Sequence, residues 1–390
     1  MSNIKKDVCD NCIIYDGLFG LEINSKGLCN FCEDPNHVNP NWRKVRIDNP
    51  TRQKRLMEWN EIIRTLQDKN GQNEYSCVIG YSGGKDSTAL IDTFINEYNL
   101  KPFLVTINTG FMTDIAKDNI RKSLDKMNLS KDHIFVEDAI PTFIKLYRHL
   151  FLNHLSAEKA LAADVCHTCT DLIHTVIVKE AIKKKIDYVF IGFSPDQIAR
   201  YFFKTPKKDT YNDGLPRPQE FKKEINNEDL KWYLNENTNI DILPQVIYPY
   251  HVIEYDENEI INRIEAKGLI DKGKGDPVLT NCHVIKAAMY YDFYRYGAIF
   301  YAVQYAELVR QKDNDIEREK ARKYYLRLMS RIGKNIKNDN FDSEGYENFL
   351  KKIGITKDII FKIIENQRKN DPNLKKILKN IDVISNKRLK

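Results

Sequence analysis

The feature that most constrains the fold is an alternation of short apolar runs and amphipathic stretches between residues 75 and 193. We expect strands at 75–81, 101–108, 132–137 and 186–193, and helices at 86–100, 114–128 and 169–185. Because parallel strands need crossover connections, this order predicts an α/β fold, a doubly wound parallel sheet. An amphipathic helix is expected at 50–70, and the chain from 283 onward is expected to form a helical C-terminal region.

Composition and charge narrow the class of protein. The 390 residues are enough for two or three domains. No stretch approaches about 18 consecutive apolar residues, and the first residues lack the apolar run of a signal peptide, so we expect a cytoplasmic protein with no membrane span. The net charge is +6, yet residues 311–390 carry 21 Lys and Arg against 12 Asp and Glu. Such a basic region is most often a solvated helical surface, and a nucleic acid or an acidic partner is the alternative.

A glycine-containing loop connects the first expected strand to the first expected helix. It consists of Ser82, Gly83, Gly84, Lys85, Asp86 and Ser87. The glycines let backbone N–H groups approach a phosphate closely, and the helix N-terminus that follows favours negative charge. The two serines add hydroxyl donors, Lys85 adds positive charge, and Asp86 can hold Mg²⁺ that bridges phosphate oxygens. The spacing differs from a Walker A loop, which has four residues between its glycines.

This loop resembles the S-G-G-x-D-S loop of the PP-loop ATP pyrophosphatases, an adenine nucleotide alpha hydrolase-like superfamily with a HUP-like fold. The resemblance implies that the chain binds ATP with Mg²⁺, cleaves it between the α and β phosphates and adenylates a carbonyl oxygen of a substrate. A nucleophile would then displace AMP. It also implies that the loop binds pyrophosphate and that Lys85 and Asp86 are catalytic.

Other candidate residues follow the remaining strands. Asn108 ends the strand expected at 101–108, while Gly192 and Asp196 lie at and just beyond the end of the strand expected at 186–193. Ligands of doubly wound sheets bind where the carboxyl ends of the strands meet. We therefore assign Asn108 and Gly192 to cofactor binding and Asp196 to catalysis.

Four cysteines near the N-terminus have the spacing of a metal site. Cys9 and Cys12 form one C-x2-C pair, and Cys29 and Cys32 form a second after sixteen residues. This pattern is typical of tetrahedral zinc. Four thiolates leave no open position, so we predict a structural zinc that supplies folding energy to a small module. An iron–sulfur site is the alternative.

A second group of cysteines has a less specific pattern. Cys166 and Cys169 form a C-x2-C pair that we expect immediately before a helix, whose N-terminus would lower their thiol pKa values, and Cys282 follows 113 residues later. Three thiolates can hold a [4Fe–4S] cluster with one open iron. The alternatives are a second zinc with His167 or His283, a redox or nucleophilic pair, and unrelated buried cysteines.

Two families within the superfamily resemble the chain. Iron–sulfur tRNA thiolation enzymes share the zinc module, the loop, the C-x2-C pair and a later lone cysteine, and their segment corresponding to 244–270 is similar. They usually carry G-H-x-x-D-D where this chain has Gly192 to Gln197 as G-F-S-P-D-Q, and they have a C-terminal cysteine module that this sequence lacks. This resemblance implies transfer of sulfur to a tRNA base, with a sulfur-donor protein.

The second resemblance, over residues 5–365, is to bacterial N-acetyl sugar amidotransferases of surface-polysaccharide and flagellar sugar pathways. It implies an N-acetyl sugar whose acetamido group becomes acetamidino, with ammonia from a glutaminase partner. We take this amidotransferase as the main prediction and a [4Fe–4S]-dependent sulfurtransferase, acting on a tRNA base or a small-molecule carbonyl, as the alternative. A homo-oligomer is compatible with both. The predicted parts are a zinc module at 1–45, the PP-loop domain at 46–285 and a helical region at 286–390.

Overall fold

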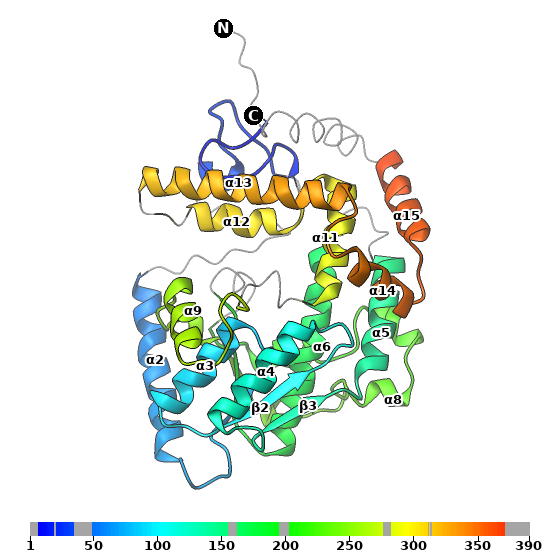
Figure 1. Cartoon of the computed structure of the whole chain (residues 1–390). Helices are drawn as coiled ribbons and strands as arrows, with labels where there is room; N and C mark the ends of the chain where they lie inside the picture. The colour runs from blue at the N-terminus through cyan, green and yellow to red at the C-terminus, as the bar shows by residue number, and fades with distance from the viewer. Residues whose placement is uncertain are drawn as a thin grey trace. The chain divides into compact units, whose positions relative to one another are not determined.

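The computed structural model describes residues 7–18, 21–34, 49–154, 162–194, 203–275, 282–310, 312 and 314–370 (Figure 1). The described residues form two compact units. The first unit draws on Met1–Lys44, Arg148–Cys166 and His283–Lys390, and the second on Val45–Tyr147 and His167–Cys282. The N-terminal cysteines and the C-terminal helices, which are far apart in the sequence, thus belong to the same unit.

A five-stranded parallel sheet forms the centre of the second unit. Its strands are β1 (Cys77–Gly80), β2 (Pro102–Ile107), β3 (His133–Val136), β4 (Tyr188–Ile191) and β5 (Gln245–Ile247). They lie in the order β3-β2-β1-β4-β5, and every neighbouring pair is parallel. The chain therefore runs outward from β1 to β3 and returns past β1 to β4. This reversal places a topological switch point between β1 and β4, where sheets of this kind bind ligands.

Helices connect these strands and cover the sheet. They are α2 (Asn49–Asp68), α3 (Lys85–Asn96), α4 (Asp114–Met127), α5 (Ile140–His149), α6 (Ala162–Lys183), α7 (Lys207–Asp213), α8 (Asn227–Leu230) and α9 (Glu257–Ala266). Right-handed crossovers place α3 and α4 on one face and α6, which leads back across the sheet, on the other. Trp59 of α2 packs edge-on against Phe94 and Phe190 in the core, with ring centroids 6.0 and 5.7 Å away. The predicted doubly wound sheet is confirmed.

Two parts of this unit differ from the sequence prediction. The polar segment at 205–229, where the sequence analysis places no helix or strand, contains α7, a 3₁₀ turn (Gln219–Lys223) and the start of α8. Capping explains α8: the Asn226 side chain accepts hydrogen bonds from the backbone N–H groups of Glu228 and Asp229. Helix α5 was not predicted. Further 3₁₀ turns lie at Ile240–Ile242 and Pro249–His251.

The first unit combines the cysteine module with helices. It contains α1 (Asn30–Glu33), a π-helical turn (Leu150–His154), α11 (His283–Tyr296), α12 (Tyr301–Arg310), α13 (Asp315–Lys337), α14 (Ser343–Lys352) and α15 (Lys357–Asn370). Their packing is aromatic: Tyr290 of α11 stacks on Tyr346 of α14 with ring centroids 4.5 Å apart. The predicted helical C-terminal region is confirmed. Within the described residues, no helix is both long and apolar enough to cross a membrane.

Candidate active site

The loop at 82–87 carries the chain from β1 into the N-terminus of α3, as the sequence predicts. Gly83 has a φ of +75°, in the left-handed region that favours glycine. A Cβ at this position would also collide with the backbone carbonyl oxygen of Ala116. Gly84 is the N-cap residue of α3. The backbone of the loop is thus bent at the end of a central strand, and the N-terminus of a twelve-residue helix follows it directly.

The two serines and Gly192 meet at the switch point of the sheet. Ser82 Oγ lies 3.1 Å from Ser87 Oγ, and the Ser87 hydroxyl donates to the Gly84 carbonyl oxygen at 3.2 Å. Gly192 directly follows β4, and a Cβ there would be only 3.1 Å from the Ser87 Cα. The absence of a side chain at Gly192 therefore lets the end of β4 approach the loop. The loop and Gly192, both predicted to bind the cofactor, thus lie side by side at the ends of β1 and β4.

Lys85 and Asp86, two of the three residues predicted to be catalytic, form an ion pair. The Lys85 Nζ donates to Asp86 Oδ2 at 2.7 Å, and the two side chains are only 4% and 16% exposed. The Tyr255 hydroxyl accepts a hydrogen bond from Lys85 Nζ at 3.2 Å and donates one to Asp86 Oδ1 at 2.8 Å. Tyr255, which lies between β5 and α9, is therefore hydrogen-bonded to both side chains.

A second carboxylate faces Lys85. Glu257 Oε1, in the first turn of α9, lies 3.3 Å from Lys85 Nζ, and its side chain is 51% exposed. Burial lowers the pKa of Lys85, but the neighbouring carboxylates of Asp86 and Glu257 outweigh it and raise the pKa above its usual value. Lys85 is therefore a firmly protonated, buried cation with two anionic partners.

Four residues of this site were missed by the sequence prediction. Tyr255 and Glu257 contact Lys85, as described above. Tyr250 donates its hydroxyl proton to the backbone carbonyl oxygen of Asp86 at 2.9 Å. Asn119 of α4 donates to the carbonyl oxygens of Gly83 at 3.1 Å and Lys274 at 3.0 Å. No local motif marks these residues, because only the sheet topology brings their segments to the loop.

Asn108 and Asp196 are the remaining residues that the sequence assigns to the site. Asn108 lies directly after β2 and is 5% exposed. Its side-chain amide donates to Glu137 at 2.8 Å, and its oxygen accepts the N–H of Gly110 at 2.9 Å. These bonds shape the turn after β2, and cofactor binding by Asn108 stays a prediction. Asp196 lies outside the described residues.

The four N-terminal cysteines come together as predicted. The sulfur atoms of Cys9, Cys12, Cys29 and Cys32 all lie within 4.8 Å of one another. The sulfurs of Cys12 and Cys29 are 3.6 Å apart, and the Cys29 N–H points at the Cys9 sulfur at 3.3 Å. Across the part of the chain that the structure describes, this is the one group of three or more Cys, His, Asp or Glu residues gathered so closely.

A helix braces this cysteine cluster. Arg322 of α13 donates from Nε to the carbonyl oxygen of Cys12 at 2.8 Å and from Nη2 to that of Cys9 at 3.0 Å. The Arg310 guanidinium lies over the ring of Phe31 at 5.2 Å. The module thus gains tertiary contacts from the helices of its own unit, in addition to whatever its cysteines bind.

The second group of cysteines lies inside a helix, not before one. Helix α6 begins at Ala162, so both Cys166 and Cys169 are helical, and the expected lowering of their thiol pKa values by a helix N-terminus is wrong for Cys169. Burial, with the nearby Cys282 as a second cause, raises its pKa. The Tyr147 hydroxyl lies 2.8 Å from the Cys169 sulfur. Cys169 and Cys282 both belong to the second unit, whereas Cys166, one turn earlier on α6, belongs to the first.

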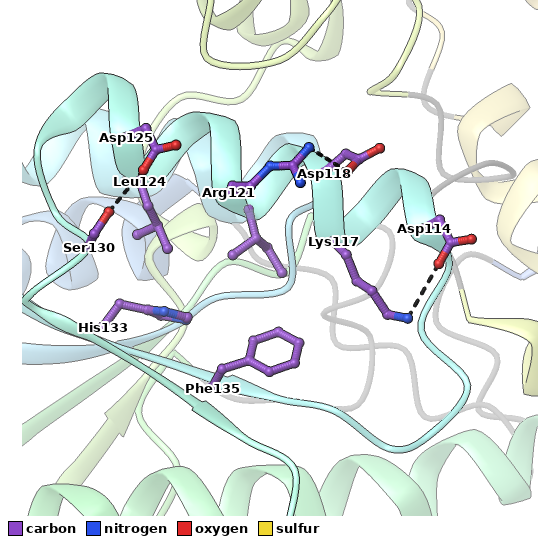
Figure 2. Close-up of a pocket in the computed structure, with 10 residues that line it drawn as sticks. Asp114, Lys117, Asp118, Arg121, Leu124, Asp125, Ser130, His133 and Phe135 are labelled. Carbon is purple, nitrogen blue, oxygen red and sulfur yellow. Dashed lines mark hydrogen bonds and ion pairs between the residues drawn. The ribbon is translucent and has the colours of Figure 1, made fainter.

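A groove of about 560 Å³ lies elsewhere on the second unit, between α4 and β3 (Figure 2). Its charged residues pair among themselves: Lys117 with Asp114 at 3.3 Å and Arg121 with Asp118 at 2.9 Å. Burial lowers the pKa of His133, at its floor, to about 4. None of the predicted site residues lines this groove.

No family model matches the chain. A segment of 126 residues is 30% identical to the uncharacterized protein MJ1599 of Methanocaldococcus jannaschii, and the match covers 31% of this chain and 41% of that protein. The chain thus spans less than half the length of this relative.

Among solved structures, the chain is similar to the U34-tRNA thiolase NcsA from Methanococcus maripaludis with its [4Fe-4S] cluster. The TM-score is 0.33 and the identity is 17%, over 70% of this chain and 78% of that one. A likeness at this level decides nothing about chemistry, so the functional conclusion rests on the geometry of the loop and the cysteines.

Proposed function

We propose that this chain is an ATP-dependent enzyme that adenylates a carbonyl oxygen of its substrate and releases pyrophosphate. The observation that best supports this proposal is the position of the loop at 82–87. It lies at the switch point between β1 and β4, bent at Gly83 and followed by the N-terminus of α3. Backbone N–H groups at such a helix start favour phosphate, and the two serine hydroxyls add further donors.

The first step follows from the side chains at this loop. The substrate carbonyl oxygen attacks the α-phosphorus of ATP, the bond to the bridging oxygen of the β-phosphate breaks, and pyrophosphate leaves with that oxygen. Lys85, a buried cation, neutralises charge on the departing pyrophosphate. Asp86 is the carboxylate that would hold Mg²⁺ on the phosphates, and Tyr255 fixes its orientation through Oδ1.

A binding experiment tests this assignment without a known substrate. A fluorescent ATP analogue should bind the full chain in Mg²⁺, and inorganic pyrophosphate should displace it, because the loop is built for the β and γ phosphates. Asp86→Asn should weaken binding in Mg²⁺ while the cysteine cluster keeps its metal. Failure of pyrophosphate to compete, or unchanged binding by the Asp86 variant, would refute the site.

For the second step of the reaction, in which AMP is displaced, we favour sulfur transfer. In it, a sulfur nucleophile adds to the activated carbon, and AMP leaves with the original carbonyl oxygen. The supporting observation is that burial and the nearby Cys282 together raise the pKa of the Cys169 thiol, beside the buried Tyr147, in the unit that holds the loop. These two thiolates would then be ligands of a [4Fe–4S] cluster, which when bound would supply an open iron for sulfide. The substrate would be a tRNA base or a small-molecule carbonyl.

Amidotransfer is the second candidate, and it rests on the resemblance over residues 5–365. In this reaction ammonia displaces AMP from an N-acetyl sugar, and a glutaminase partner supplies the ammonia. Iron and acid-labile sulfide, measured on protein purified without oxygen, separate the two. About four irons and four sulfides per chain, lost in Cys282→Ser, would support sulfur transfer. If the purified protein contained neither iron nor acid-labile sulfide, amidotransfer would be the second step.

The N-terminal cluster is proposed to hold a structural zinc ion. A tetrahedral ion with metal–sulfur bonds of about 2.3 Å needs sulfurs about 3.8 Å apart, which is close to the 3.6 Å between Cys12 and Cys29. A cubane cluster separates its cysteine sulfurs more widely. Four thiolates leave no position for substrate, so the ion would brace the module. Metal analysis of the Cys29→Ser variant tests this: one zinc per chain should be lost.

A further inference from the structure

Helix α13 carries an exposed surface of one charge. From residue 320 to its end at Lys337, every exposed side chain of this helix is a lysine, an arginine or Tyr324. Six of these residues lie at helical positions i, i+3, i+4, i+7, i+11 and i+14 and therefore share one face. This basic face consists of Lys320, Lys323, Tyr324, Arg327, Arg331 and Lys334.

The cations of this face extend well beyond the last turn of α13, where the helix dipole favours positive charge. The acidic residues of α13 are confined to its beginning, and the last of them, Glu319, lies 3.5 Å from Lys323. Beyond that point cations follow one another at i, i+3 and i, i+4 spacing, which destabilises a helix through repulsion. The opposite side is anchored in the core by Met329, Ile332 and Ile336. The buried side of α13 thus stabilises the helix, although the cations on its basic face repel one another.

The composition of the basic face indicates its partner. Protein–protein interfaces are depleted in lysine at their centre, whereas phosphate backbones are bound mainly by lysine and arginine. The face extends over about 21 Å, with cations one helical turn apart. In its middle Tyr324 is 61% exposed, and such an aromatic ring can stack on a base.

We propose that the basic face of α13 binds the sugar-phosphate backbone of a single-stranded nucleic acid segment, with Tyr324 stacked on one of its bases. The five cations neutralise successive phosphates and release their counterions. This inference stands on α13 alone and does not depend on the adenylation proposed above.

Fluorescence anisotropy with a labelled single-stranded RNA tests this inference. The full chain is titrated at several salt concentrations between about 50 and 200 mM. The test variant is Lys323→Gln with Arg327→Gln and Arg331→Gln. The control is Lys351→Gln with Lys362→Gln and Lys369→Gln, which removes the same charge from exposed positions of α14 and α15. Circular dichroism and thermal melting verify that both variants are folded.

If the basic face binds RNA, the wild type and the variants should differ in affinity and in salt dependence. Wild type binds the RNA, and the test variant lowers the steepness of log affinity against log salt by about 2, because three phosphate contacts are lost at about 0.7 each. The control variant changes it little. Tyr324→Ala weakens binding roughly tenfold without changing the salt slope. No binding by wild type, an equal loss in the control, or equally tight binding of polyglutamate would each overturn the proposal, the last by indicating an acidic protein as partner.

Discussion

Replacing Glu257 by glutamine should strengthen the binding of pyrophosphate and of MgATP. On the proposed function, Glu257 would compete with phosphate for Lys85, since its carboxylate lies 3.3 Å from the lysine nitrogen. Two unit charges at that distance attract by about 1 to 5 kcal/mol for effective dielectric constants between 80 and 20. Because Glu257 is 51% exposed, screening brings the net value to about 1 kcal/mol. That corresponds to roughly a fivefold gain in affinity.

The matched control for this variant is Glu259→Gln. Both glutamates lie in the first turn of α9, so each substitution removes the same favourable interaction with the helix N-terminus. Displacement of a fluorescent ATP analogue by pyrophosphate gives the dissociation constants, and Glu257→Asp should restore most of the wild-type value. Equal changes in the two glutamine variants, or weaker binding in Glu257→Gln, would refute competition for Lys85.

Three further perturbations probe the loop, the cysteine module and the sheet. Gly83→Ala should lower the free energy of unfolding by about 2 kcal/mol or more, measured with urea, because a left-handed backbone and the Ala116 carbonyl both oppose a Cβ. Arg322→Gln should destabilise the module by about 2 kcal/mol and speed its loss of metal to a chelator; unchanged metal release would show that the two carbonyl contacts are dispensable. Burial lowers the pKa of His133 to about 4, so the stability present above about pH 6.5 should be lost as the pH falls toward 4. Urea unfolding across that range should show a smaller loss in His133→Gln.

The parts of the site that the sequence predicts are local. A strand, two glycines and a helix within about twenty residues determine the loop, because glycine dihedrals and helix starts depend on near neighbours. The N-terminal cysteines are predictable for the same reason, since the spacing of each pair fits one metal ion. Gly192 was found through the order of the strands alone, and its close approach to Ser87 follows from the parallel pairing of β1 with β4.

The rest of the site depends on contacts that no periodicity encodes. Tyr255 reaches Asp86 across 169 residues of sequence, after the chain has passed through β5. A tyrosine in such a segment looks like any other half-buried aromatic residue. The start of α6 was misplaced because its first turns, which contain Val165 and Cys166, have little apolar periodicity and follow a segment with no clear capping residue.

The arrangement of Lys85 and Asp86 bears on which form of the nucleotide the site accepts. Their side chains neutralise each other, and Tyr255 bonds to both. On the proposed function, free Mg²⁺ would have to draw Asp86 away from a buried lysine, and free ATP would have to draw Lys85 away from a half-buried carboxylate. Either change breaks the buried ion pair and leaves Lys85 facing the exposed Glu257, or Asp86 facing the Tyr255 hydroxyl, in place of its buried partner, which is costly. The magnesium complex offers phosphate to Lys85 and the metal to Asp86 at once, so both charges exchange partners together. We infer that the ion pair makes the site selective for this complex over either component, with Tyr255 holding Asp86 through the exchange.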